Sequence, residues 1–267
     1  MVDKSAADWK EDSRSFDSVP DDYDVYRPGY PKELVDSLIE LTGIPPAGKI
    51  LEIGAGTGKA TLLFAERGFS ILCIEPGANL AAVAARNLKA YPGVQFEISR
   101  FEAWIETAGQ FDLVLSAQAF HWVPKEVGYT KAASALKPRG HLALFWNMYP
   151  GFETQLAAEF DKVYQKIAPG LGSPFSVTDE AIQQRVVEIE ASGCFGTVTV
   201  KRFPWSMRYT TRQYQGLLNT YSDHLRLSGV TRQHLIHAIG EVIDSHGGSI
   251  ERPYVAVLYV AQKLPHR

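Results

Sequence analysis

The sequence predicts an α/β fold in which a mostly parallel, seven-stranded sheet carries helices on both faces. Three observations predict it. Short apolar runs alternate with helical segments between residues 30 and 147. The first apolar run leads directly into a group of glycines, as a buried strand does when it enters a tight turn. Two more strand patterns follow among helical segments in the C-terminal half.

The first half of the chain shows the alternation most clearly. Leucines recur at helical spacing over residues 30–43, and Gly43 marks the end of that helix. The following patterns predict, in order, a strand in KILEIGAG, a helix over 59–68, a strand over 70–75, an alanine-rich helix over 79–91, strands in VQFEIS and over 111–118, a helix in KEVGYTKAASALK and a strand over 141–147.

After Pro150 the rhythm changes. The patterns predict helices over 152–168 and 179–192, a strand over 197–207, helices in TRQYQGLLNTYSDHLRL and TRQHLIHAIGEVIDSHGG, and a strand over 254–263. We therefore expect a flexible N-terminal arm over 1–22 and one domain over 23–267, with helical insertions around 150–195 and 208–250. These insertions are expected to form a lid over the ligand edge of the sheet.

Composition narrows the possible partners. The 267 residues carry a net charge of −3, which argues against nucleic acid because phosphate binding leaves a basic footprint. The N-terminus has no signal-peptide pattern, and no apolar run is long enough for a membrane span. We expect a cytoplasmic protein without a membrane partner. Cys73 and Cys194 lack a paired spacing, and His234 and His237 lack a third ligand, so no metal is expected.

The stretch LEIGAGTGKAT, residues 51–61, resembles three kinds of nucleotide-binding loop. A phosphate-binding P-loop would need glycine at Ile53 and a hydroxyl at Ala60. A dinucleotide loop would need glycine at Lys59. What remains is a G-x-G-x-G pattern made by Gly54, Gly56 and Gly58. Glycines at these places let the backbone turn sharply and approach a ligand closely.

This pattern resembles the first motif of class I S-adenosylmethionine-dependent methyltransferases, whose fold is Rossmann-like. FDLVLSAQAFHWV and the upstream DVYRPGYP resemble a small-molecule subset of that family that includes trans-aconitate methyltransferase. The resemblance covers residues 23–147, and LLNTYSDH and GGSIERPY extend it more loosely. It implies methyl transfer from S-adenosyl-L-methionine to a small-molecule acceptor. Because AQAF stands where N-P-P-[YF] would follow the fourth strand, O-methylation of a carboxylate or hydroxyl is favoured.

The resemblance also implies the cofactor-binding residues. Glu75 ends the second strand, seventeen residues past Gly58, where carboxylate oxygens accept hydrogen bonds from the ribose hydroxyls. Arg100 stands where the family often has an aspartate for the adenine amine, which puts that contact in doubt, although the backbone at Phe101 can read the ring. The predicted cofactor residues are Arg27, Glu52, Gly54, Ala55, Gly56, Gly58, Glu75, Pro76, Arg100, Phe101, Glu102, Ala117 and Gln118.

His121 is the candidate catalytic residue, with three interpretations open. It removes a proton from a hydroxyl or amine, it orients a carboxylate, or it packs the strand end. Arg27 pairs with the methionyl carboxylate or forms a surface salt bridge. The candidate substrate contacts, each of which could equally be core or lid packing, are Phe120, Trp122, Trp146, Tyr221 and His224.

Two other functions remain open. A non-catalytic S-adenosylmethionine-binding module would fit the departure at Arg100, and an NAD(P)-dependent oxidoreductase would fit the first two loop glycines. The helical insertions would serve as a lid or as a dimer surface, so both a monomer and a homodimer are compatible with the sequence.

Overall fold

The computed structural model describes residues 16–105, 108–171 and 178–265, which fall into two compact units. Unit 1 comprises Met1–Pro28, Met148–Val177 and Pro204–Val255. Unit 2 comprises Gly29–Asn147, Thr178–Phe203 and Ala256–Arg267.

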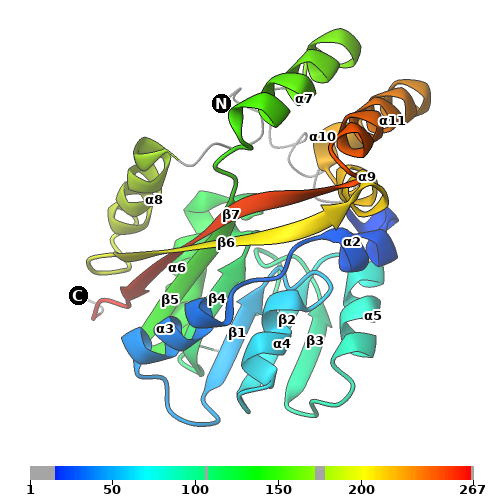
Figure 1. The fold of residues 1–267 in the computed structure, drawn as a ribbon. Helices are drawn as coiled ribbons and strands as arrows, with labels where there is room; N and C mark the ends of the chain where they lie inside the picture. Colours follow the sequence, from blue (N-terminus) through cyan, green and yellow to red (C-terminus); the bar gives the residue numbers. More distant parts are fainter. Residues whose placement is uncertain (1–15, 106–107, 172–177, 266–267) are drawn as a thin grey trace. The chain divides into compact units, whose positions relative to one another are not determined.

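Seven strands form one sheet in the order β3-β2-β1-β4-β5-β7-β6. They are β1 (Lys49–Ile53), β2 (Ser70–Glu75), β3 (Val94–Ile98), β4 (Phe111–Ala117), β5 (Leu136–Met148), β6 (Thr199–Thr210) and β7 (Ser249–Gln262). The pairs β1–β2, β2–β3, β1–β4 and β4–β5 are parallel. The arrows of β6 and β7 point in opposite directions (Figure 1), and the bridge between Phe195 and Lys263 is antiparallel. The predicted mostly parallel, seven-stranded Rossmann-like sheet is confirmed.

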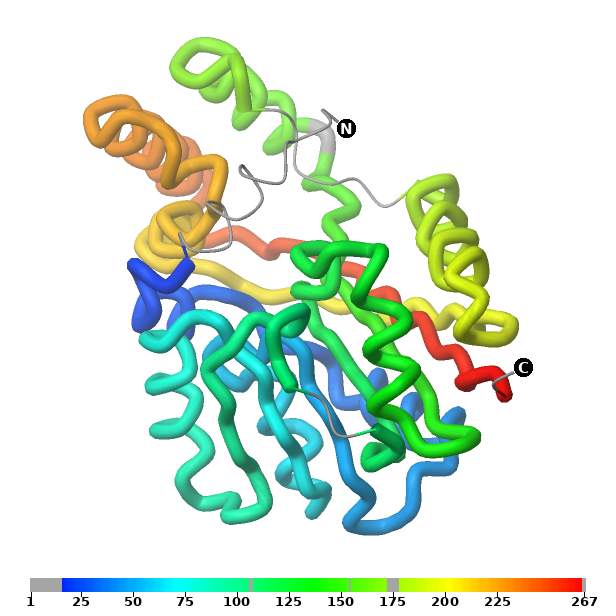
Figure 2. The backbone as a smooth tube through the Cα atoms, turned by 180° about the vertical axis from the view of Figure 1, so that it is seen from behind, coloured from blue at the N-terminus to red at the C-terminus, as the bar shows by residue number. Residues whose placement is uncertain are grey.

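Helices cover both faces of the parallel strands in unit 2. They are α3 (Lys32–Thr42), α4 (Lys59–Ala65), α5 (Ala78–Asn87), α6 (Lys125–Ala135) and α8 (Asp179–Ala191), with the short helix η2 (Phe120–Trp122) after β4. Helices α3 and α4 lie in front of the strands in Figure 1, whereas α6 lies nearest the viewer in Figure 2, which shows the reverse side. This arrangement explains why β1 and β4 are mostly apolar and are buried along most of their length.

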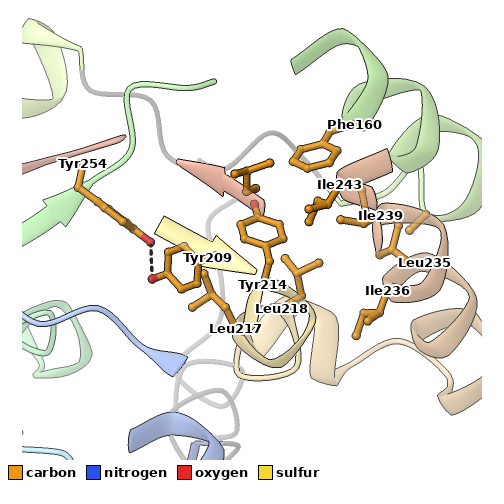
Figure 3. Packing of buried hydrophobic residues seen from close by; sticks show 12 residues of the cluster. Phe160, Tyr209, Tyr214, Leu217, Leu218, Leu235, Ile236, Ile239, Ile243 and Tyr254 are labelled. Carbon is orange, nitrogen blue, oxygen red and sulfur yellow. Dashed lines mark hydrogen bonds between the residues drawn. The ribbon is translucent and has the colours of Figure 1, made fainter. Parts of the chain in front are cut away.

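Unit 1 builds a separate core from helices and the adjoining strand segments. Its elements are η1 (Phe16–Ser18), α2 (Pro20–Tyr26), α7 (Thr154–Ile167), α9 (Thr211–Leu218), α10 (Ser222–Leu225) and α11 (Gly229–Ser245). Figure 3 shows Ile239 and Ile243 of α11 beside Tyr214 of α9. The hydroxyls of Tyr209 and Tyr254, on β6 and β7, are hydrogen-bonded to each other at 3.1 Å inside this core.

Three segments differ in the structure from the bounds that the sequence pattern indicates. Of the expected flexible arm, residues 1–15 lie outside the described residues, but residues 20–22 already belong to α2, where a proline and two aspartates favour a helix start. The single helix expected over 211–227 is split at Thr220, whose carbonyl accepts a hydrogen bond from Arg27. Residues 150–195 fall in both units, since Met148–Val177 belongs to unit 1 and Thr178–Phe203 to unit 2, and the helical insertions stay a prediction.

Candidate functional site

The glycine loop connects β1 to α4 and needs glycine at two positions for different reasons. Gly54 has φ +72°, and a Cβ there would lie 2.3 Å from the Cβ of Ala119. Gly58 has φ +83°, and its Cβ would lie 2.7 Å from a methyl carbon of Leu88. Both residues adopt a left-handed backbone conformation that side chains disfavour. The loop therefore depends on backbone shape and on close approach by neighbouring chain segments.

Glu75, at the end of β2, holds this loop. One carboxylate oxygen, Oε2, accepts a hydrogen bond from the backbone N–H of Gly56 at 2.8 Å, and Oε1 accepts one from the N–H of Gly77 at 2.8 Å. The residue is only 5% exposed. A carboxylate offers about four lone-pair sites, which makes it a suitable acceptor for ligand hydroxyls.

The end of β4 lies against the same loop. The hydroxyl of Ser116 donates to the carbonyl oxygen of Ile53 at 2.7 Å, and Ala119 contacts Gly54. Gln118 has φ +59°, an uncommon conformation for a residue other than glycine. Its side-chain Oε1 is buried without a hydrogen-bond partner among the described residues. An unsatisfied buried acceptor beside a glycine cradle fits a bound nucleoside, whose hydroxyl or amino groups would donate to it.

Glu52 is the next-to-last residue of β1 and lies two positions before Gly54, where the glycine loop begins. Its side chain is fully buried, and neither carboxylate oxygen has a hydrogen-bond partner among the described residues. Burial raises the pKa of Glu52 to about 8, the nearby Thr61 hydroxyl opposes this rise, and the negative charge of Glu75 adds to it. A carboxyl in such surroundings is mainly protonated at neutral pH. Glu52 is thus a buried acid behind the loop.

The residues after β3 lie close to the core. Phe101 is buried and stacks on Trp104 with ring centroids 5.9 Å apart. Arg100 forms an ion pair with Glu102 at 3.6 Å. Three other predicted cofactor residues belong to the same loop and strand ends. Ala55 lies in the glycine loop, Pro76 follows the last residue of β2, and Ala117 is the last residue of β4.

His121 lies in η2, directly after β4. Its Nδ1 accepts a hydrogen bond from the indole N–H of Trp146 at 3.3 Å, and its ring lies 4.6 Å from that of Trp122. These neighbours half-bury the imidazole, although part of it stays open to solvent. Burial lowers the pKa of His121 to about 3, with a smaller contribution from the Arg185 guanidinium. With Nδ1 acting as acceptor, the neutral ring carries its proton on Nε2.

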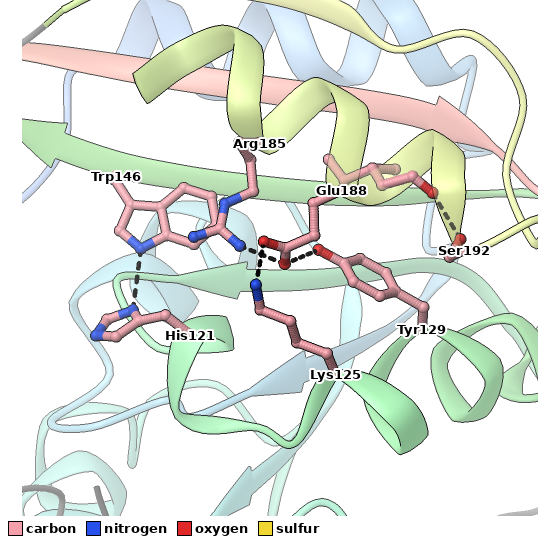
Figure 4. Close-up of polar contacts among 8 residues, drawn as sticks. His121, Lys125, Tyr129, Trp146, Arg185, Glu188 and Ser192 are labelled. Atoms are coloured by element: carbon pink, nitrogen blue, oxygen red, sulfur yellow. Dashed lines mark hydrogen bonds and ion pairs between the residues drawn. The ribbon is translucent and has the colours of Figure 1, made fainter. Parts of the chain in front are cut away.

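A group of charged side chains surrounds Trp146 (Figure 4). Glu188 of α8 accepts hydrogen bonds from Arg185 at 2.6 Å, from Lys125 at 2.7 Å and from the Tyr129 hydroxyl at 2.7 Å. The Arg185 guanidinium lies over the Trp146 ring, 4.7 Å from its centroid. Two cations share one carboxylate, so this group carries one excess positive charge beside His121.

The other predicted side chains occupy different surroundings. Phe120 is 3% exposed and packs on Tyr129 with centroids 5.0 Å apart. Arg27, Tyr221 and His224 lie in unit 1. Arg27 donates to Thr220 Oγ1 at 2.8 Å and lies over the Tyr221 ring. The rings of Tyr221 and His224 are 5.5 Å apart, as three-residue helical spacing predicts. Cofactor or substrate contacts by these residues stay predictions.

Sequence reasoning missed Arg185 and Glu188. Their spacing of three residues in a predicted helix was a visible signal of an ion pair. Nothing in that spacing indicated that the helix packs beside Trp146. It also missed Arg252, because β7 begins at Ser249 and not near Tyr254.

Within the described ranges, no three histidine, cysteine or acidic side chains gather in a way that could hold a metal ion. No helix in those ranges is both long and apolar enough to cross a membrane.

Comparison with known proteins agrees with this geometry. Residues 50–140 match the family described as "Methyltransferase domain". An uncharacterized methyltransferase of Schizosaccharomyces pombe is 24% identical over 94% of this chain and 98% of its own length.

Two solved structures share the fold. A candidate type II methyltransferase of Anaeromyxobacter dehalogenans aligns with a TM-score of 0.66 at 20% identity, over 90% of this chain and all of that one. A phosphoethanolamine N-methyltransferase of Haemonchus contortus, in complex with phosphomonomethylethanolamine and S-adenosylhomocysteine, aligns with a TM-score of 0.56 at 14% identity, over 98% of this chain and 61% of that one. Residues 50–140 thus match a methyltransferase domain, and the chain is a methyltransferase.

Proposed function

We propose that this enzyme methylates an oxygen atom of a small molecule, with a carboxylate as the preferred acceptor and a hydroxyl as the alternative. The observation that carries the proposal is the hydrogen bond from Trp146 to His121 Nδ1. With Nδ1 occupied, a neutral ring would present Nε2–H as a donor, which supports the proposal that His121 orients the acceptor and does not remove a proton from it. A carboxylate is ionised at neutral pH and needs no base.

The proposed cofactor site uses the glycine loop, Glu75 and Gln118. The loop backbone between Gly54 and Gly58 would lie against the ligand, Glu75 would accept from ribose hydroxyls, and Gln118 Oε1 would accept from the nucleoside. When bound, S-adenosylmethionine supplies a methyl group on a sulfonium centre. The protein's own part is to bind and align the acceptor oxygen with that carbon, because alignment dominates the rate of such displacements.

Charge near His121 supports an anionic acceptor. Arg185 and Lys125 exceed Glu188 by one positive charge, and the planar guanidinium of Arg185 suits a carboxylate. The Haemonchus contortus neighbour, whose complex contains a small phosphorylated amine, supports a small-molecule acceptor at this fold. Membership of the subset that includes trans-aconitate methyltransferase remains part of this proposal.

The test is a transfer assay with S-adenosylmethionine carrying a tritiated methyl group, against a panel of small carboxylic acids, phenols and amines. Methyl esters release volatile tritiated methanol in alkali, whereas methyl ethers and methylamines do not. We expect alkali-labile label with at least one carboxylic acid. Label found only in alkali-stable products from amines would contradict O-methylation.

Two variants sharpen the assay. His121→Asn keeps a side-chain N–H donor but cannot act as a base, so substantial kcat should remain if His121 orients the acceptor. Arg185→Met should raise KM for a carboxylate acceptor more than it lowers kcat, because it removes a charge used in binding. Arg202→Met, which removes an exposed arginine paired with Asp179, is the control for general loss of charge.

A further inference from the structure

Arg252 of β7 is a buried cation in unit 1. It is 3% exposed, and its side chain is enclosed by tyrosine rings. The guanidinium carbon lies 4.2 Å from the centroid of Tyr149, 5.3 Å from Tyr254, 5.5 Å from Tyr214 and 5.7 Å from Tyr221. Its one hydrogen bond to a described residue runs from Nη1 to the Tyr214 hydroxyl at 3.1 Å.

This cation has no counter-ion among the described residues. The side chains that act most strongly on its pKa are tyrosines, whose hydroxyls are neutral at neutral pH, and no ion pair joins it to a carboxylate in the described part of the chain. Buried charges in proteins are normally paired, because removing an ion from water is costly unless another charge compensates. Four tyrosine rings offset part of that cost through cation–π attraction.

Ring faces do not satisfy the N–H groups in the guanidinium plane. The Nε–H of Arg252 is buried without an acceptor among the described residues, and the hydroxyl of Tyr149, a residue 8% exposed, is buried without a partner. An arginine N–H can only donate, and a tyrosine hydroxyl can donate as well as accept. Both atoms therefore lack the same thing, an acceptor.

A second cation adjoins this group. The Arg27 guanidinium lies 4.5 Å from the centroid of Tyr221, the ring that Arg252 also faces. Arg27 is hydrogen-bonded only to neutral atoms of Thr220 in the described part of the chain. Two arginines thus face the Tyr221 ring, and neither forms an ion pair with a carboxylate among the described residues.

We propose that Arg252 and Tyr149 bind an oxyanion, a carboxylate or phosphate group carried by a small molecule. The anion would accept from Arg252 Nε–H and from the Tyr149 hydroxyl, so it would supply the missing charge and both missing hydrogen bonds. The tyrosine rings enclose the cation and keep bulk water from competing for it. This site goes beyond the proposed function, because its assignment does not depend on which atom receives the methyl group.

The test is isothermal titration of the full chain with citrate as the carboxylate probe and inorganic phosphate as the phosphate probe, at ionic strength fixed with sodium chloride. We expect saturable binding of at least one probe with a Kd of about 1 mM or tighter. Preference for citrate or phosphate identifies the anion's source. Absence of saturable binding of both probes would overturn the proposal.

Variants locate the binding. Arg252→Met should abolish it, and Arg252→Lys, which keeps the charge but loses the planar fork, should weaken it about fivefold or more. Tyr149→Phe removes one hydroxyl that has no partner in the protein, so it should weaken binding about threefold or more while leaving Tm unchanged or higher. If the Arg252 variants fail to fold, Tyr149→Phe decides alone.

Arg208→Met is the matched control, since it removes an exposed positive charge from the same unit. Equal weakening by Arg208→Met and Arg252→Met would mean general electrostatic attraction and would overturn the site. Titration of each variant with S-adenosylhomocysteine separates this proposal from the proposed function. An Arg252 variant that loses anion binding but retains S-adenosylhomocysteine binding would support the anion site and would leave the proposed function untouched.

Discussion

The carboxylate of Glu75 accepts a hydrogen bond from the backbone N–H of Gly56, nineteen residues earlier in the chain, at 2.8 Å. A side chain at the end of β2 thereby holds the loop that follows β1. Its other oxygen accepts from Gly77 N–H, so both oxygens orient the backbone. Glu75 therefore has a structural role that is separable from cofactor binding.

Glu75→Gln should expose that structural role. The amide keeps one acceptor oxygen, but its NH₂ group would face one of the two backbone N–H donors and leave it unpaired. We expect the free energy of unfolding to fall by about 1–3 kcal/mol in urea titrations. Glu97→Gln, at an exposed position on the neighbouring strand β3, should change it by less than about 0.5 kcal/mol. Equal effects of the two variants would contradict the role of Glu75.

Gly54→Ala tests the contact between the loop and the end of β4. The new Cβ would lie 2.3 Å from the Cβ of Ala119, a separation that real carbon atoms do not tolerate. Gly68→Ala is the matched control, because Gly68 also has positive φ, +81°, but nothing lies within 4 Å of its Cβ position. Gly54→Ala should cost about 2 kcal/mol more than the control, and it should also weaken S-adenosylhomocysteine binding. Similar Tm values for both variants would contradict the close contact between Gly54 and Ala119.

Glu52 predicts an unusual dependence of stability on pH. Its pKa is about 8 in the folded protein and near 4.5 when unfolded, so unfolding releases its proton between these values. Stability from this group is therefore fully present below about pH 4.5 and falls as pH rises toward about 8, by as much as several kcal/mol. Glu52→Gln should flatten this decline in urea titrations from about pH 5 to about pH 9. An unchanged slope would contradict the buried neutral acid.

His121 should not titrate in the physiological range. Because its pKa is lowered to about 3, its imidazole NMR signals should stay constant from about pH 5 to about pH 8. Folding energy tied to its neutral form is lost only as pH falls below about 6.5 toward that value. Trp146→Phe removes the hydrogen bond that favours the neutral ring, so the midpoint should rise. A wild-type midpoint between about pH 6 and 7 would restore His121 as a candidate base.

The order of strands and helices could be predicted because each apolar run is local. β2 occupies residues 70–75 as predicted, since the apolar run 71–74 marks a parallel strand that is buried along most of its length. Glycine spacing likewise indicated the loop. What periodicity could not give was the neighbour of each helix: α8 looked like part of one insertion with residues 152–168, yet it packs in unit 2.

The hydrogen-bonding state of single atoms was also beyond the sequence. Nothing in AQAFHW indicates that Trp146 donates to His121 Nδ1, because the two residues are twenty-five positions apart. Arg252 lies in a polar stretch that reads as surface, and only the alternation of β7 places it at a buried position. Such features depend on tertiary packing, which propensity and local pattern do not encode.

The central claim is that the loop of Gly54, Gly56 and Gly58, held by Glu75, binds the cofactor. The most direct measurement is isothermal titration of wild type and Glu75→Ala with S-adenosylhomocysteine, in parallel with NADH. We predict a Kd in the micromolar range for wild type, weakened at least about tenfold by the substitution, and no binding of NADH. Folded wild-type protein that binds NADH, or that fails to bind S-adenosylhomocysteine, would contradict this claim.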